Sequence, residues 1–170
     1  MPTKHRIIPC LWFDNQAEEA ARYYVSIFKN AKIGKITHYS AAGFDVHQRP
    51  AGSVMTVAFE LDGEPFTALN GGPHFKFNEA VSFQVECKNQ EEIDFYWEKL
   101  KEGGDPNAQQ CGWLKDKFGL SWQIVPANMD EFFEDEESEA AQRAMEAMLP
   151  MKKIDIEEIR RAHAGEMVRR

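Results

Sequence analysis

The spacing of hydrophobic residues predicts the same succession of elements twice along the first 127 residues. Each half begins with an apolar stretch of strand length, at residues 6–13 and 81–87. Apolar residues then recur every three or four positions, to about residue 29 and about residue 102, which is typical of a helix packed on a sheet. Further apolar or alternating stretches predict strands at residues 33–40, 54–61, 65–70, 108–115 and 120–126.

The starts of the two predicted helices also resemble each other. Both have an Asn-Gln break, a Glu-Glu pair and aromatic residues about one turn later. Glu18-Glu19 and Glu91-Glu92 lie 73 positions apart (91 − 18), well beyond the roughly 20 to 50 residues of a solenoid repeat. We interpret the pattern as one βαβββ module used twice, with a shorter or missing fourth strand in the second. Chance similarity between two polar helix starts is the alternative.

Local signals predict where these elements begin and end. Asp14 or Asn15 is expected to cap the first helix, and Asn89 or Gln90 the second, because side chains of this kind accept bonds from free helix N–H groups. Asp62-Gly63 lies between two apolar stretches and predicts a tight β-hairpin.

Three other stretches have a distinct composition. The strand at 6–13 is apolar nearly throughout, which suits burial on both faces, although Pro9 lacks a backbone N–H donor and indicates an edge or interface position. Residues 41–52 are rich in Gly, Ala, Asp, Gln and Pro and predict a mobile loop. Residues 128–170 are acidic and helical in pattern, with helices expected at 137–148 and after Asp155. We expect this tail to pack on the protein, against a second subunit, or to act as a hook for a partner.

Charge and cysteine content exclude several classes of function. The formal net charge is −8, from 20 Lys and Arg against 28 Asp and Glu, so the surface repels nucleic acid. No apolar run reaches the length of a membrane helix and the amino terminus does not have the pattern of a signal peptide, so a cytoplasmic protein is expected. Cys10, Cys87 and Cys111 form no closely spaced metal pair, and we expect idle thiols.

Several motifs together resemble one known family. They are Pro-Cys-Leu-Trp-Phe at 9–13, Ala-Glu-Glu-Ala at 17–20, Ala-Leu-Asn-Gly-Gly-Pro at 68–73, Gly-Trp-Leu-Lys-Asp-Lys-Phe-Gly at 112–119 and Ser-Trp-Gln-Ile-Val-Pro at 121–126. With the doubled module, these motifs are similar to those of the PhnB-like proteins, often labelled 3-demethylubiquinone-9 3-methyltransferase. That family belongs to the vicinal oxygen chelate superfamily, which includes glyoxalase, bleomycin-resistance and dioxygenase proteins.

The resemblance implies an α+β fold in which two βαβββ modules form a cupped, mixed β-sheet of eight strands with helices outside. We expect this domain to cover residues 1–127, with modules at about 5–72 and 78–127, and residues 128–170 to be a helical carboxy-terminal extension. The resemblance also implies a homodimer and a small-molecule ligand in the cup, with no nucleic-acid or membrane partner.

Metal-using members of the superfamily hold their metal with His or Glu on the first and last strands of each module. The matching positions here are Ile7, Thr67, Ser82 and Gln123. Isoleucine cannot coordinate a metal, and the other three are weak neutral donors, so we expect no metal and no other cofactor. His5 would share a side of the strand with Ile7 and would serve only after a shift of register.

Polar residues at alternate strand positions predict a semi-polar pocket for a small molecule instead. The expected ligand-binding residues are Trp12, Phe66, Thr67, Asn70, Ser82, Gln84, Ser121 and Gln123. Their neighbours Phe83, Val85, Trp122 and Ile124 are expected to pack under the helices. Solvated strand positions without a ligand are the alternative.

Catalytic residues are not identified, and two classes of function stay open. A binding module needs only aromatic and amide contacts, whereas a lyase or dioxygenase needs a metal or an acid and base pair. The methyltransferase of the family label is disfavoured, because residues 14–16 join the first strand and helix without the glycines of a nucleotide-binding turn.

Overall fold

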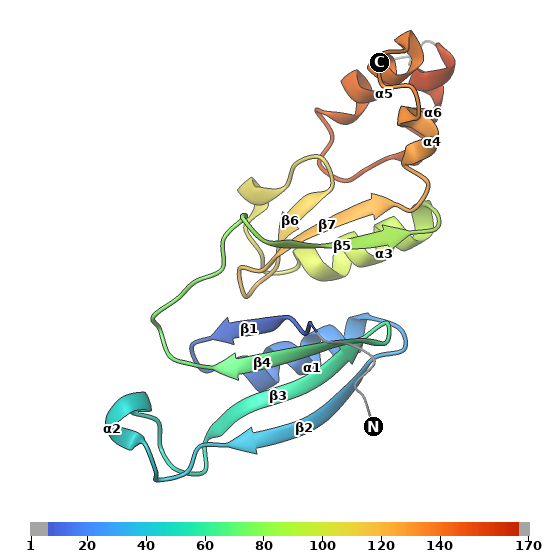
Figure 1. Ribbon diagram of the computed structural model, residues 1–170. Helices are drawn as coiled ribbons and strands as arrows, with labels where there is room; N and C mark the ends of the chain where they lie inside the picture. Colours follow the sequence, from blue (N-terminus) through green and yellow to red (C-terminus); the bar gives the residue numbers. More distant parts are fainter. Residues whose placement is uncertain (1–6, 167–170) are drawn as a thin grey trace. The chain divides into compact units, whose positions relative to one another are not determined.

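The computed structural model describes residues 7–166, and the chain divides into two compact units at Lys76 and Phe77. Each unit contains one β-sheet with a helix on one face (Figure 1). This arrangement confirms the α+β fold with two strand and helix modules. None of the helices within residues 7–166 has the length and hydropathy needed to cross a bilayer.

The first unit is built on a four-stranded sheet in the order β1-β4-β3-β2. Strand β1 runs parallel to β4, and the other neighbours are antiparallel. Its elements are β1 (Cys10–Phe13), α1 (Ala17–Ile27), β2 (Lys32–His38), α2 (Phe44–His47), β3 (Val54–Leu61) and β4 (Glu64–Asn70). Strands β3 and β4 meet at the predicted hairpin, where Asp62 and Gly63 both have positive φ, as a type I′ turn requires.

Helix α1 packs its apolar face on one side of this sheet. Ala20, Ala21 and Tyr24 are fully buried, and the Tyr24 ring stacks on Phe59 of β3 with 6.3 Å between ring centroids. Small residues at positions 17, 20 and 21 let the helix lie close to the strands. The core of this unit therefore lies between α1 and one face of the sheet.

Three local predictions for this unit are wrong. Strand β1 is not buried on both faces, because Leu11 and Phe13 are buried while Cys10 is exposed and Trp12 is partly exposed. Residues 41–52 are not only a loop, since they contain the short helix α2. The cap of α1 is neither Asp14 nor Asn15: the helix begins after Gln16, which makes no capping bond, and the cap comes from β4 instead.

The second unit repeats the first without a counterpart of β2. Its module contains β5 (Ser82–Cys87), α3 (Gln90–Lys101), a 3-10 turn η1 (Pro106–Ala108), β6 (Trp113–Lys115) and β7 (Ser121–Pro126). The sheet has the order β5-β7-β6, with β5 parallel to β7. Asn89 caps α3 by accepting from the Glu92 N–H at 3.0 Å, which confirms the prediction for this helix. The missing fourth strand was also predicted; the implied total of eight strands becomes seven in the described residues.

The carboxy-terminal extension folds into three helices that join the second unit. These are α4 (Asp130–Phe133), in the stretch after Asn128 that was expected to be helical, α5 (Glu139–Met148) and α6 (Ile156–Ala164), capped by Asp155 as expected. The linker between α5 and α6 lies beside the start of β6, where the N–H groups of Cys111 and Gly112 donate to the carbonyls of Met151 and Lys152. The linker thus accepts backbone hydrogen bonds beside the β6 edge of the sheet. At the equivalent edge, the first unit has its fourth strand, β2.

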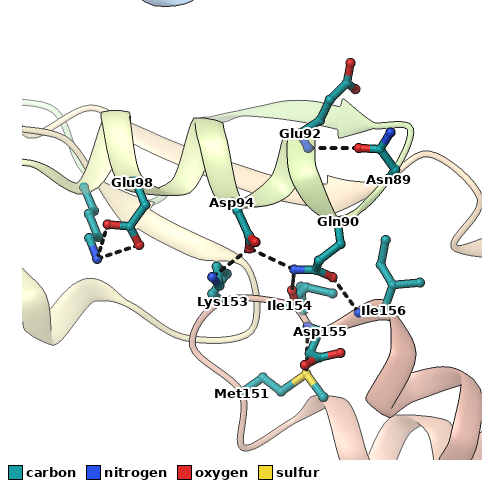
Figure 2. Close-up of polar contacts among 11 residues, drawn as sticks. Asn89, Gln90, Glu92, Asp94, Glu98, Met151, Lys153, Ile154, Asp155 and Ile156 are labelled. Atoms are coloured by element: carbon teal, nitrogen blue, oxygen red, sulfur yellow. Dashed lines mark hydrogen bonds and ion pairs between the residues drawn. The ribbon is translucent and has the colours of Figure 1, made fainter.

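Gln90 at the start of α3 holds the same linker (Figure 2). Its side-chain N–H group donates to the Ile154 carbonyl at 3.0 Å, and its side-chain oxygen accepts from the Ile156 N–H at 2.9 Å. Asp94, one turn along α3, accepts from Gln90 and pairs with Lys153 at 2.7 Å. Lys153 and Gln90 lower the pKa of the Asp94 carboxyl, so these contacts are retained at neutral pH.

A buried aspartate organises the turn between β6 and β7. Asp116 is 2% exposed, and its carboxylate accepts from the N–H groups of Phe118 and Leu120 and from the Trp122 indole at 2.9 Å. Substitution by alanine would remove the acceptor of these three donors, which lie in a buried or partly buried position.

We predict that Asp116→Ala lowers the free energy of unfolding of the second unit by about 3 kcal/mol. Urea denaturation followed by Trp fluorescence would measure the change. Asp105→Ala is the matched control, since Asp105 accepts a single backbone bond at the exposed turn η1 and should cost less than about 1 kcal/mol. Equal losses for the two variants would contradict the role given to Asp116.

Candidate functional site

The sheet face away from α3 carries a row of polar side chains. The register pairs Ser82 with Ser121 and Gln84 with Gln123 across β5 and β7. The Gln123 amide donates to the Ser82 hydroxyl at 2.8 Å, and the Gln84 amide donates to the Gln123 side-chain oxygen at 3.4 Å. We call the four residues the polar row. They were all predicted as ligand-binding residues, and the structure brings them together.

The residues between them face the helix, as the alternation of a strand requires. Trp122 and Ile124 are buried, and Phe83 lies against the Trp122 ring with 5.8 Å between centroids. A shift of register by one residue would exchange these apolar side chains with the polar row, so burial under α3 fixes which side chains the other face presents.

Ser121 differs from the rest of the row because it is 1% exposed. Its hydroxyl oxygen is buried and has no hydrogen-bond partner among residues 7–166. A buried hydroxyl without a partner is uncommon in folded proteins. The Ser121 hydroxyl can therefore still donate and accept a hydrogen bond.

Two residues of β6 extend this face and were missed by the sequence analysis. Trp113 pairs with Gln123 and Lys115 pairs with Ser121, so both point to the same side as the polar row. Lys115 also forms an ion pair with Glu79, which lowers the pKa of that carboxyl. The alternation within Trp113-Leu114-Lys115, of which only Leu114 is buried, was the signal that could have revealed them.

The first unit presents Trp12 and Thr67 on the face away from α1. Thr67 lies between Cys10 of β1 and Ala58 of β3 in the sheet register. The Trp12 indole donates to the Gly72 carbonyl at 2.8 Å and meets the edge of the Phe75 ring at 4.9 Å. Trp12 also lies so close to Gly71 that a Cβ at this position would overlap the indole. The backbone at 71 and 72 therefore holds this indole in place.

Phe66 and Asn70, also expected to bind a ligand, lie on the opposite face of β4, under α1. Phe66 is 9% exposed and stacks on Phe59 at 5.3 Å. The side-chain oxygen of Asn70 accepts from the Ala17 N–H at 2.8 Å, and its amide donates to the Val54 carbonyl at 3.2 Å. Asn70 thus supplies the cap that α1 lacks locally.

The strand positions used by metal-dependent proteins of this fold hold poor ligands. Thr67, Ser82 and Gln123 offer neutral oxygen donors, and Ile7 is a hydrocarbon side chain that is 89% exposed. His5 lies outside the described residues. No group of three or more His, Cys, Asp or Glu side chains that could hold a metal lies within residues 7–166. The donor set does not fit a divalent metal.

The three thiols are all free. Burial raises the pKa of the Cys87 thiol to about 12, with a smaller contribution from the Glu92 carboxylate, and burial also raises the pKa of Cys10 and Cys111. Because nucleophilic attack requires a thiolate, none of the three is activated at neutral pH.

Comparison with known proteins identifies the family. Residues 5–125 match the family model described as 3-demethylubiquinone-9 3-methyltransferase, and a Bacillus cereus structure described as a putative member of that family, PhnB protein, is 32% identical. The chain belongs to this PhnB-like family. The match covers 71% of this chain and 99% of the B. cereus chain, with a TM-score of 0.60. The resemblance seen in the sequence is therefore confirmed.

More distant structures share the PhnB-like fold alone. A protein from Pseudomonas aeruginosa is 17% identical, with coverage of 72% of this chain and 98% of its own and a TM-score of 0.54. The fosfomycin resistance protein FosX from Mesorhizobium loti is 11% identical, with coverage of 76% and 97% and a TM-score of 0.51. No curated protein matches the chain.

We predict that Asn70→Ala lowers the free energy of unfolding of the first unit by about 2 kcal/mol, because the buried Ala17 N–H and Val54 carbonyl lose their partner. Thr67→Ala, three residues away on the other face, should cost less than about 1 kcal/mol. Thermal unfolding of both variants would compare them. A larger loss for Thr67→Ala would contradict the division of β4 into a core face and an open face.

Proposed function

We propose that this PhnB-like protein binds a small organic molecule on the helix-free faces of its sheets, without a resident metal. The observation that supports the proposal is the polar row of Ser82, Gln84, Ser121 and Gln123, whose hydroxyl and amide groups lie together on one face. Such groups recognise carbonyl, hydroxyl or amide oxygens of a neutral or weakly anionic ligand.

The bonds within the row prepare it for binding. Gln123 uses its amide on Ser82 and its oxygen on Gln84, which fixes the orientation of all three side chains. Each amide still has a second N–H, and the Gln84 oxygen accepts no bond from Gln123. A ligand can bond to these groups without the row having to reorganise, which reduces the entropy lost on binding.

Aromatic side chains supply the apolar part of the proposed contact. Trp113 lies beside Gln123 in the register of the second unit's sheet. An indole offers a large flat surface with few rotatable bonds, so it contacts planar groups at low entropic cost. We propose binding rather than methyl transfer, since β1 and α1 are joined by Asp14-Asn15-Gln16 without a glycine turn.

We further propose that the protein forms a homodimer, as the family resemblance implies. Light scattering after size exclusion should give about twice the mass of 19.5 kDa of one chain.

A ligand screen tests the binding proposal. We predict that at least one small polar aromatic compound raises the melting temperature of the protein, and that Gln123→Ala weakens its binding at least tenfold, a loss of about 1.4 kcal/mol. Isothermal titration would give the dissociation constants. Gln109→Ala is the matched control, because Gln109 follows the turn η1 and lies outside the sheet. Unchanged affinity in Gln123→Ala, with the ligand still bound, would reject the polar row as the site.

A metal titration tests the proposal that the protein has no resident metal. We predict that protein dialysed against chelator shows no saturable binding of Mn(II), Ni(II), Zn(II) or Fe(II), because Thr67, Ser82 and Gln123 are neutral donors. Calorimetry on the untagged chain measures this. Stoichiometric binding that is abolished by His5→Ala would instead support a metal-dependent lyase or dioxygenase.

A further inference from the structure

The extension contains a groove that belongs to neither sheet. It lies along α5 and the end of α4, has a volume of about 550 Å³, and is lined by Phe133, Glu136, Ala141, Gln142, Met145 and Glu146. We call it the α4–α5 groove. The family match ends at residue 125, so the groove lies outside the matched part of the chain.

Within residues 7–166, the apolar side of the groove is only partly covered. Ala141 is buried at its base, whereas Met145 is 38% exposed. Leu149 follows one helical turn later and is 53% exposed, so the apolar strip continues beyond the groove. Ala144 and Met148 are buried, and α5 packs closely with α6. The exposed strip is therefore a second apolar side of α5.

The surroundings of the groove are strongly acidic. Between residues 128 and 149 there are eight carboxylates and one cationic residue. The carboxylates are Asp130, Glu131, Glu134, Asp135, Glu136, Glu137, Glu139 and Glu146. The cation, Arg143, donates to the carbonyls of Ala162 and His163. Its charge is therefore directed at the end of α6, while Glu136 and Glu146 line the groove.

Helix α5 is attached to the rest of its unit on both sides. Ser138 caps it, and the linker after it is bonded to Cys111, Gly112 and Gln90. A surface held in this way loses little freedom when a partner binds.

We propose that the α4–α5 groove binds a basic amphipathic helix of a partner protein. The apolar face of such a helix would cover Met145 and Leu149, and its Lys or Arg residues would meet Glu136 and Glu146. Apolar strips with one-turn spacing suit a helix, and the flexible side chain of methionine adapts to the residues that it meets. A second copy of this chain is the poorer occupant, because with a net charge of −8 it would bring more negative charge to an acidic rim.

A synthetic peptide tests this proposal on the full chain. The probe is a fluorescent 18-residue Leu/Lys peptide with helical amphipathic spacing, and its control is a peptide of the same composition with the spacing scrambled. Fluorescence anisotropy is expected to show saturable binding of the amphipathic peptide, at least tenfold tighter than that of the scrambled peptide. Raising the salt concentration should weaken it, because ion pairs at the rim are exposed.

Two variants separate the apolar and the charged contributions. Met145→Gln is expected to weaken binding at least tenfold, with Val46→Gln, an exposed apolar residue of α2, as the unaffected control. Glu136→Gln combined with Glu146→Gln should weaken binding and flatten its salt dependence, whereas Glu19→Gln should change neither. Circular dichroism checks that each variant is folded.

Three results would overturn the proposal. They are equal binding of the scrambled peptide, unchanged affinity in Met145→Gln, and a protein dimer that falls to a monomer in Met145→Gln. The last would assign the groove to a second copy of the chain. None of these results depends on the small-molecule site, because the polar row lies on β5 and β7.

Discussion

Within residues 7–166, each sheet has a helix packed on one face, α1 in the first unit and α3 in the second, and side chains on a strand point alternately to the two faces. The face under the helix must be apolar and closely packed. Its buried residues include Leu11, Phe13 and Phe59 in one unit and Trp122 and Ile124 in the other. The opposite face is then free to carry hydroxyl, amide and indole groups. The proposed binding surface therefore depends on burial at the other side of the same strands. A change of register by one residue would move the polar side chains under the helix and the apolar ones to the opposite face.

Sequence patterns predicted those features that depend on neighbours along the chain. The Asp62-Gly63 hairpin, the Asn89 cap and the Asp155 cap each bond within a few residues, and the structure confirms them. The Asn70 cap could not be predicted in this way, because Asn70 is 53 residues from Ala17 and only the parallel pairing of β1 with β4 brings them together. The apolar composition of β1 was misleading for a related reason: Trp12 is apolar but lies on the open face.

The same distinction applies to the candidate site. Ser82, Gln84, Ser121 and Gln123 belong to two strands with clear alternation, so their shared face could be predicted. Strand β6 has only three residues, too few for a clear period, and Trp113 and Lys115 were missed. Phe66 lies on a predicted strand, but its assignment to a face required the sheet register. Side chains in long, regular strands are thus easier to place from sequence than those in short ones.

Gln90 shows how the carboxy-terminal extension constrains a residue of the module that it joins. Its amide is engaged by the Ile154 carbonyl and the Ile156 N–H, and glutamate at this position could accept from Ile156 but not donate to Ile154. The side chain at position 90 therefore makes contacts in two places. It bonds to Asp94 within α3, and it bonds to the backbone of the segment that joins α5 to α6. Among homologues that share the extension, positions 90 and 153–156 should covary, while homologues that end after β7 are free to diverge at position 90.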